Sequence, residues 1–227
     1  MSVVKPLALV VFDLDHTLLS GDTDVLWCDF LLARGLLERS AFVERNAQVE
    51  QAYRAGSIGA QAFSEFYLST LAGRSRAQCD ALRDVFMRQC IVPRIPASAR
   101  SLVGSHRAAG DLLVMSTATN RYLTELTAAE LGFEHLIATE AELADDVFTG
   151  RPHGVLNMRE GKVLRLRDWL TAKELPASML AQATFYSDSI NDLPLLQAVR
   201  TPIAVDPDSM LLGQAQRRGW KVLRLSR

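Results

Sequence analysis

The stretch that decides the fold reads Val10-Val11-Phe12-Asp13-Leu14-Asp15-His16-Thr17-Leu18. An apolar run over residues 7–12 ends in two carboxylates, Asp13 and Asp15, with a single leucine between them. Such a run is typical of a strand in a parallel sheet that is covered on both faces. Ligands of these sheets bind beyond the carboxyl ends of the strands, where both acids are expected to lie. Because two acids there repel each other unless a cation or a shared proton relieves them, we predict a divalent metal site.

The rest of the chain divides into a helical part and an alternating part. Apolar residues recur at helical spacing from about residue 22 to residue 90, interrupted by glycines, which predicts roughly four helices. From Pro96 onward, strands and helices alternate. The expected strands are 112–117, 135–138, 184–187, 203–205 and 222–225, and the expected helices are 96–110, 121–131, 162–173, 193–199 and 210–218. Residues 140–157 are expected to form an irregular or hairpin excursion.

This alternation predicts an α/β fold: a Rossmann-like three-layer core with a mostly parallel sheet and an inserted α-helical cap domain. The predicted core comprises residues 1–20 and 91–227, and the predicted cap comprises residues 21–90.

The composition excludes several classes of protein. The 227 residues are 48% hydrophobic and 22% charged, with a formal net charge of −1, so we expect neither a nucleic-acid partner nor a membrane partner. Three widely spaced cysteines, Cys28, Cys79 and Cys90, suggest neither a disulfide framework nor a zinc site. We therefore expect a soluble protein of the reducing cytoplasm; the oligomeric state does not follow from the sequence.

Three further polar clusters follow strands or open helices. Ser116 and Thr117 offer hydroxyls at a strand end, and Thr117 is the preferred candidate for binding an anion. Lys162 places an ammonium group near a helix start, where an acid would be the ordinary choice. Asp188 and Asp192 follow another strand in the run Ser187-Asp188-Ser189-Ile190-Asn191-Asp192. Together with Asp13, these groups suit a metal, an anion and a free carboxylate nucleophile.

These four elements, in this order, resemble the motifs of the haloacid dehalogenase superfamily of phosphohydrolases. They are the D-x-D-x-T element from Asp13 to Thr17, the strand-end Thr117, Lys162, and the S-D-S-x-N-D element from Ser187 to Asp192. The helical insertion resembles the C1 cap of that superfamily, and the motifs are similar to those of its phosphoserine-phosphatase-like subfamily IB. The resemblance spans roughly residues 10–204.

The resemblance implies a role for each residue. Asp13 would be the nucleophile that forms an aspartyl-phosphate, and Asp15 the general acid and base. Asp13, the main-chain carbonyl of Asp15 and Asp188 would hold Mg²⁺. Thr117 and Lys162 would bind the phosphoryl oxygens, while Asn191 and Asp192 would support this arrangement from behind. Asp192 alone could also be a first-turn acid that complements a helix dipole, the less favoured interpretation, and His16 falls in the variable position of the motif.

The residues at the positions expected to contact the substrate differ from those of phosphoserine phosphatases. Those enzymes carry a glutamate where this chain has Asp22, which either favours an amine-bearing substrate or simply caps the first cap helix. They also use a cap arginine for the substrate carboxylate, and the best ungapped placement puts Glu65 there. Arg34, Arg45 and Arg54 are candidate replacements that spacing does not separate. Phosphoserine is therefore a doubtful substrate.

The leading hypothesis is a Mg²⁺-dependent phosphomonoesterase that hydrolyses a small phosphorylated metabolite. Two alternatives remain open from the sequence. The first is a phosphotransferase, in which an acceptor alcohol replaces water. The second is a non-catalytic module that binds a phosphate ligand, although such a module has no use for the second acid, Asp15.

Overall fold

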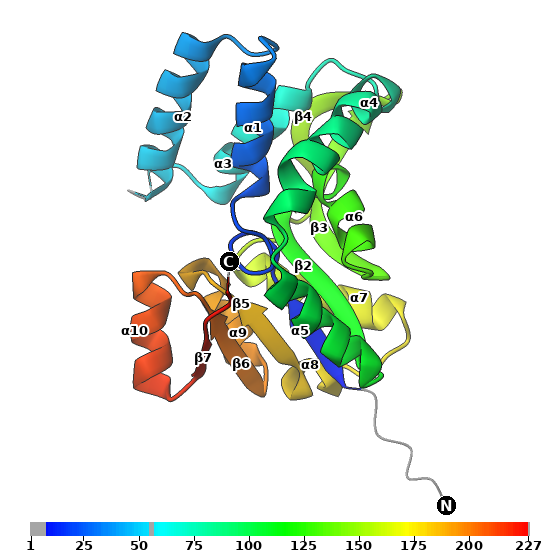
Figure 1. The fold of residues 1–227 in the computed structure, drawn as a ribbon, viewed down its shortest axis with the longest axis vertical. Helices are drawn as coiled ribbons and strands as arrows, with labels where there is room; N and C mark the ends of the chain where they lie inside the picture. The colour runs from blue at the N-terminus through cyan, green and yellow to red at the C-terminus, as the bar shows by residue number, and fades with distance from the viewer. Residues whose placement is uncertain (1–7, 55–56, 227) are drawn as a thin grey trace, which may run out of the picture.

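The computed structural model describes residues 8–54 and 57–226, which form a three-layer α/β core and a helical unit beside one end of its sheet (Figure 1). The described strands are β1 (Leu9–Phe12), β2 (Leu112–Asn120), β3 (His135–Ala144), β4 (Val147–His153), β5 (Thr184–Ser187), β6 (Thr201–Val205) and β7 (Lys221–Leu223). They form one sheet in the order β4-β3-β2-β1-β5-β6-β7. Every neighbouring pair is parallel except β3 and β4. The predicted fold class is confirmed.

Strand β1 lies in the middle of the sheet because every one of its residues is apolar and buried. Its side chains alternate between the two faces, as the period of two along a strand requires. Val10 and Phe12 pack in one apolar cluster, and Leu9 and Val11 pack in the other. A strand covered on both faces therefore delivers the residues that follow it, Asp13 onward, to one edge of the sheet.

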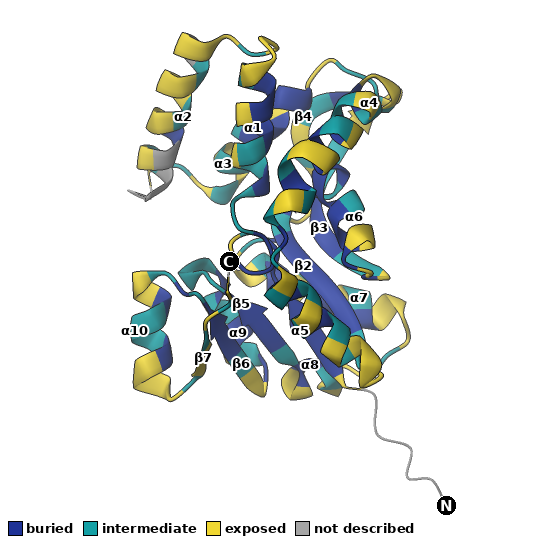
Figure 2. Cartoon of the chain, in the orientation of Figure 1, coloured by how far each residue is buried: buried dark blue, intermediate teal, exposed yellow. Residues whose placement is uncertain are grey.

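Helices cover both faces of the sheet (Figure 1). The α5 (Ala97–Ala108) and α6 (Arg121–Glu130) helices contribute to the cluster that contains Phe12. The opposite face is covered by α7 (Glu160–Ala172), α8 (Ser178–Gln182), α9 (Leu193–Ala198) and α10 (Ser209–Arg218). Figure 2 shows the strands as largely buried and the outer surfaces of the helices as exposed, as expected for a sandwiched parallel sheet.

The segment between β1 and α5 is helical, as predicted. Its main helices among the described residues are α1 (Thr23–Ala33), α2 (Arg39–Arg54), α3 (Ala60–Leu68) and α4 (Arg76–Phe86), and a π-helical turn (Met87–Ile91) follows. Trp27 and Phe30 of α1 pack against Phe86 at the end of α4, with ring centroids 5.1 and 5.4 Å apart from it. This aromatic cluster joins the first and last helices of the insertion.

The hairpin of β3 and β4 reaches this helical unit. Phe148 exchanges two backbone hydrogen bonds with it, accepting from Gly73 N at 2.9 Å and donating to Arg74 O at 2.9 Å. The sequence predicts an irregular or hairpin excursion over residues 140–157, and the structure shows a hairpin there. Its two-residue turn, Asp145 and Asp146, has positive φ at both positions, which matches the twist of the flanking strands.

Three strands are longer than predicted, and one helix was not predicted. Strand β6 begins at Thr201, two residues before its predicted start, where it pairs with Thr184 of β5. Strand β2 continues to Asn120 because β-branched Thr117 and Thr119 favour extended backbone even though their hydroxyls break the apolar run. Strand β3 continues to Ala144 because β4 pairs with it beyond the parallel sheet. Helix α8 has five residues, too few to show a hydrophobic period. No helix of the described chain is both long and apolar enough to span a bilayer.

Leu166→Ala tests the face of the sheet that α7 covers. Leu166 is fully buried, so truncation is expected to lower the free energy of unfolding by about 2–5 kcal/mol through lost burial and the cavity left behind. Leu164→Ala on the same helix is the matched control, because Leu164 is 47% exposed. Urea unfolding of both variants measures the difference; equal losses would contradict the described orientation of α7.

Candidate active site

The site forms at the carboxyl edge of the sheet, where the loops after β1, β2 and β5 meet the start of α7. Asp13 follows β1 directly, and its backbone N–H donates to Tyr186 O of β5 at 2.9 Å. The chain then turns sharply, since Leu14 O accepts from the backbone N–H groups of Thr17, Leu18 and Leu19. This turn returns Thr17 toward Asp13. The local backbone thus fixes the first predicted motif in one compact loop.

Lys162 lies at the centre of a buried ion-paired group. Its Nζ donates to Asp13 Oδ1 and to Asp192 Oδ2, each at 2.7 Å, and all three side chains are less than 10% exposed. Burial by itself lowers the pKa of Lys162, but the two carboxylates more than offset that effect, so the net shift is upward. The ammonium group is therefore positively charged beside Asp13. Ser187 Oγ also donates to Asp192 Oδ2 at 2.7 Å, which fixes the far carboxylate.

A close glycine contact shapes the turn that presents Lys162. A Cβ on Gly161 would collide with the carbonyl oxygen of Leu156, so no larger residue fits without moving the backbone. Arg159, two residues earlier, has a φ of 52°, in the left-handed region. This tight turn lets α7 begin so that its third residue, Lys162, lies inside the site.

Thr17 connects Asp13 to Asp188. Its Oγ1 lies 3.1 Å from Asp13 Oδ2 and 3.0 Å from Asp188 Oδ1, and it accepts a hydrogen bond from Asp188 N at 3.0 Å. One hydroxyl carries one proton, so it can donate to only one of the two carboxylates at a time. Burial, with repulsion from Asp13 and Asp192, raises the pKa of Asp188 to about 8. Burial also raises the pKa of Asp13 to about 6, against the opposing effect of Lys162.

These carboxylates fit a divalent cation. Asp13 and Asp188 are held within reach of one hydroxyl, and their mutual repulsion is what a cation between them would relieve. Over residues 8–54 and 57–226, no three His, Cys, Asp or Glu side chains come close enough to share a metal ion. The Asp15 side chain points elsewhere, so a third protein ligand from this loop would be its main-chain carbonyl. Two carboxylates, a carbonyl and waters are an ordinary Mg²⁺ ligand set.

Asp15 is held by three threonines. Its Oδ1 accepts from Thr23 N at 2.7 Å and from the Thr23 hydroxyl, and its Oδ2 accepts from Thr119 Oγ1 at 2.8 Å and from Thr117 Oγ1 at 3.4 Å. Burial and repulsion from Asp22 raise the pKa of Asp15 to about 6, although the Thr23 hydrogen bonds oppose this shift. A carboxyl with a pKa near 6 is suited to gaining and losing a proton near neutral pH.

Of the two candidate hydroxyls on β2, the structure directs Thr117 toward the site. Thr117 lines the same cavity as Asp13 and Lys162, whereas Ser116 Oγ is buried and accepts from Asn157 Nδ2 at 3.1 Å. Asn191 and Asp192 also line this cavity. Asn191 Oδ1 accepts from Arg159 Nε at 3.3 Å. His16 is exposed and lies on the cavity wall with a φ of 56°.

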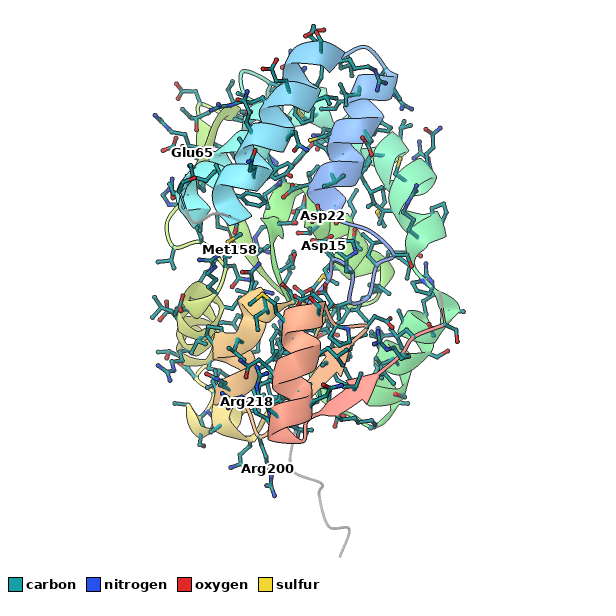
Figure 3. The ribbon with its side chains drawn as sticks, turned by 90° about the vertical axis from the view of Figure 1, so that its left-hand side faces the viewer. Asp15, Asp22, Glu65, Met158, Arg200 and Arg218 are labelled. Atoms are coloured by element: carbon teal, nitrogen blue, oxygen red, sulfur yellow. The ribbon has the colours of Figure 1, made fainter. Side chains whose placement is uncertain are left out.

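The cavity has a volume of about 200 Å³ and lies between the sheet edge and the helical unit. Figure 3 shows Asp15 and Asp22 in this junction, whereas Glu65 lies higher on the helical unit. Asp22 is the N-cap of α1, because its Oδ1 accepts from Val25 N at 3.0 Å; it also lines the cavity. Both interpretations of Asp22 made from the sequence are therefore compatible with its position.

The substrate-reading candidates of the helical unit lie away from the cavity. Glu65 and Arg45 line a separate groove between α2 and α3, and Arg34 stacks on Phe30 with its guanidinium 3.7 Å from the ring centroid. The Arg54 side chain lies outside the described residues. None of the described candidates takes the place that an arginine would need to bind a substrate carboxylate in this cavity.

Sequence reasoning missed four residues of the site. Thr23 and Thr119 hold Asp15, Asp24 lines the cavity, and Asn157 connects the strands behind it. Asn157 is fully buried, and its Nδ2 lies 2.9–3.1 Å from Ser116 Oγ, Thr117 O and Ile137 O. The threonine spacing in the run from Thr117 to Asn120 was a usable signal for Thr119. Asn157 had none, since its partners are far away in sequence.

Asn157→Ala is expected to lower the free energy of unfolding by about 1–3 kcal/mol, because it leaves buried acceptors of β2 and β3 without their shared donor. Ser116→Ala, which removes a single acceptor of that set, is the comparison and should cost less. Urea unfolding measures both variants. A loss below about 0.5 kcal/mol for Asn157→Ala would contradict this tie between the strands.

Comparisons with known proteins identify the family. The haloacid dehalogenase-like hydrolase family matches residues 10–197. A protein of Neisseria meningitidis named histidinol-phosphatase is 35% identical, over 95% of this chain and 97% of its own length. A Mycobacterium tuberculosis protein named phosphoserine phosphatase is 32% identical, over 95% of this chain and 70% of its own length.

Two solved structures show how widely this fold is shared. One is a Bordetella pertussis protein of unknown function, with 42% identity, a TM-score of 0.90, and coverage of 96% of this chain and 98% of the other. A substrate-bound phosphoserine phosphatase superposes with a TM-score of 0.70 at 14% identity, over 97% and 94% of the two chains, which shows the fold alone. With more than half of its length matched by one family, the chain belongs to the haloacid dehalogenase-like hydrolases.

Proposed function

We propose that this protein is a Mg²⁺-dependent phosphomonoesterase that hydrolyses a small phosphorylated metabolite through an aspartyl-phosphate on Asp13. The observation that carries the proposal is the buried contact of Lys162 with Asp13, together with the Thr17 hydroxyl that joins Asp13 to Asp188. A phosphatase site needs a nucleophile beside fixed positive charge, because phosphoryl transfer depends mainly on positioning and on stabilising spread negative charge. Asp13, Asp188 and Lys162 supply this combination.

Each residue has a distinct task in the reaction. An Asp13 carboxylate oxygen attacks phosphorus, and the bond from phosphorus to the leaving oxygen breaks. Asp15 gives its proton to the leaving alkoxide and then takes a proton from the water that attacks the aspartyl-phosphate. That second attack releases inorganic phosphate and regenerates the Asp13 carboxylate. The raised pKa of Asp15 and its fixed orientation between Thr23 and Thr119 support this double role.

The phosphoryl group would be held by Lys162 and Thr117, which line the cavity, and Asn191 would support this arrangement. Asp192 would act through Lys162, whose position it fixes. Bound Mg²⁺ would supply charge neutralisation at the phosphoryl oxygens and orient the phosphate. Asp13, Asp188 and the Asp15 carbonyl are the groups that would hold it.

We further propose that the chain divides into a core, residues 1–20 and 91–227, and a cap, residues 21–90. The core would bind the phosphate, and the cap would contact the leaving group and so determine specificity.

The names of the relatives make L-histidinol phosphate and O-phospho-L-serine the first physiological esters to test. Transfer to an acceptor alcohol would use the same residues, and adding alcohols to the assay and analysing the products separates it from hydrolysis. The other alternative, a non-catalytic module, would bind a phosphate ligand and release no inorganic phosphate.

The proposed location of this protein is the cytoplasm. Its three free cysteines suit that reducing compartment.

Asp13→Asn tests the nucleophile. The amide is a poor nucleophile, so phosphate release from p-nitrophenyl phosphate in Mg²⁺ is expected to fall by at least about 10³-fold. Asp168→Asn, an exposed acid on α7, is the matched control and should retain wild-type turnover. Unchanged turnover of Asp13→Asn would overturn the assignment.

The pH dependence of stability tests Asp188 without any assay of turnover. Its folded-state pKa of about 8 exceeds the usual 3.8, so between these values the folded state binds more protons than the unfolded state. In chelator, the free energy of unfolding is therefore expected to fall as pH rises through this window. Asp188→Asn should flatten the fall and stabilise the metal-free protein at pH 8 by roughly 1–3 kcal/mol.

Adding Mg²⁺ should reverse this effect in the wild type. At a tenfold excess over its dissociation constant, a ligand of the folded state adds about 1.4 kcal/mol, and Asp188→Asn should lose that gain. Thermal unfolding with Mg²⁺ or chelator measures both effects. An equal gain in the variant would remove Asp188 from the metal site.

A further inference from the structure

The cavity continues past the phosphate-binding residues toward α1 and α3 of the helical unit. Its lining there includes Asp22 and Asp24 from the start of α1, and Phe63, Ser64 and Tyr67 from α3. This is the place that the leaving group of a phosphate ester would occupy once phosphorus lies beside Asp13. The chemistry of this wall therefore bears on the substrate, on the condition that the proposed phosphatase function holds.

Carboxylates are the predominant charged groups on this wall of the cavity. Asp15, Asp22 and Asp24 all line the cavity, and Figure 3 shows Asp15 and Asp22 close together in the junction. Lys162 is the single lysine or arginine among the described residues that line the cavity, and it already contacts Asp13 and Asp192. A substrate carboxylate placed here would face like charges, an arrangement that disfavours binding.

Asp24 differs from Asp22 in how its carboxylate is used. Asp22 Oδ1 accepts the capping hydrogen bond from Val25 N at 3.0 Å. Two donor groups lie near Asp24, Thr119 Oγ1 at 3.4 Å and Asn120 Nδ2 at 3.5 Å, both near the upper limit for a hydrogen bond. The single proton of the Thr119 hydroxyl is directed to Asp15 Oδ2 at the shorter distance of 2.8 Å. Burial and repulsion from Asp22 and Asp15 raise the pKa of Asp24 well above its usual value. A cation in the cavity would give this carboxylate a stronger partner than either donor.

An aromatic surface completes the wall. Phe63 and Tyr67 line the cavity with ring centroids 5.2 Å apart, and the Tyr67 hydroxyl donates to Asn46 Oδ1 at 3.3 Å. With its hydroxyl engaged by α2, Tyr67 offers mainly ring surface to a ligand. Aromatic faces attract organic cations and planar apolar groups, and they offer nothing to a carboxylate.

We propose that the leaving group is an amino alcohol that carries a positive charge and no carboxylate, and that Asp24 is the specificity-determining residue that accepts its ammonium group. Asp22 adds negative charge next to it, and Phe63 and Tyr67 contact the carbon skeleton. This assignment rests on the charged residues that line the cavity, which on this wall are the carboxylates of Asp15, Asp22 and Asp24. A merely structural Asp24, acting as a first-turn acid of α1, would affect stability and leave substrate preference unaltered.

Matched esters test the preference in the wild-type protein. O-phospho-L-serine is 2-aminoethyl phosphate with a carboxylate added, and 2-hydroxyethyl phosphate replaces the amine with a hydroxyl. We expect kcat/KM for 2-aminoethyl phosphate to exceed both of the others by at least tenfold. A kcat/KM for O-phospho-L-serine equal to or above that for 2-aminoethyl phosphate would overturn the proposal.

Asp24→Asn tests the residue, with Asp29→Asn on an exposed position of the same helix as the matched control. The ratio of kcat/KM for 2-aminoethyl phosphate to that for 2-hydroxyethyl phosphate should fall at least tenfold in Asp24→Asn, chiefly through KM, and should hold in Asp29→Asn. An unaltered ratio in Asp24→Asn would overturn the assignment of this residue.

A second variant, Ser64→Lys, keeps the test decisive if Asp24→Asn does not fold. It adds a cation to the same wall, so the preference for 2-aminoethyl phosphate over O-phospho-L-serine should shrink or invert; an unaltered preference counts against the proposed wall. Hydrolysis of p-nitrophenyl phosphate without the expected amine preference overturns this inference alone. If no ester is hydrolysed, that one included, the proposed function fails as well.

Discussion

The buried contact of Lys162 with Asp13 and Asp192 is the interaction on which the site depends. One ammonium group and two carboxylates, from three distant parts of the chain, lie within hydrogen-bond distance in a region that is nearly inaccessible to solvent. Desolvating these charges is costly unless each is paired, so the pairing constrains where α7, β1 and the loop after β5 can sit. The same ammonium group keeps Asp13 next to positive charge. The same ion-paired group therefore both constrains the fold around the site and keeps a positive charge beside Asp13.

The sheet explains why such an arrangement forms reliably. Parallel strands covered on both faces end together at one edge, and the polar residues that follow β1, β2 and β5 are gathered there without long loops. The threonines of β2 then hold Asp15, while Thr17 joins Asp13 to Asp188. Asn157 connects β2 to β3 directly behind these groups. Asp15 and Asp188 are thus oriented by neutral donors, which leaves their charge available to a cation or a proton.

The helical unit gives the cavity a second wall of different character. Its acids and aromatic rings, from α1 and α3, line the same cavity as the sheet-edge residues proposed to bind phosphate. The hairpin of β3 and β4 contacts the same unit through backbone hydrogen bonds at Gly73 and Arg74, so the helices are not attached to the core by their connecting segments alone. The chain belongs to the haloacid dehalogenase-like hydrolases, and the side chains contributed by the helical unit are those on which the proposed substrate preference depends.

The sequence by itself determined the fold class, the helical insertion and the order of the four motifs, because apolar period and motif spacing are local properties of the chain. Tertiary structure alone decided which groups meet. Ser116 and Thr117 are adjacent hydroxyls, and only the packing of Asn157 shows that Ser116 points away from the cavity. Glu65 was placed near the substrate by ungapped spacing, yet α3 turns it toward a separate groove. Asp24 reaches the cavity because α1 begins with Asp22 as its cap, a detail of helix phase. Side-chain direction depends on contacts between residues far apart in sequence, and such contacts leave no periodic signal along the chain.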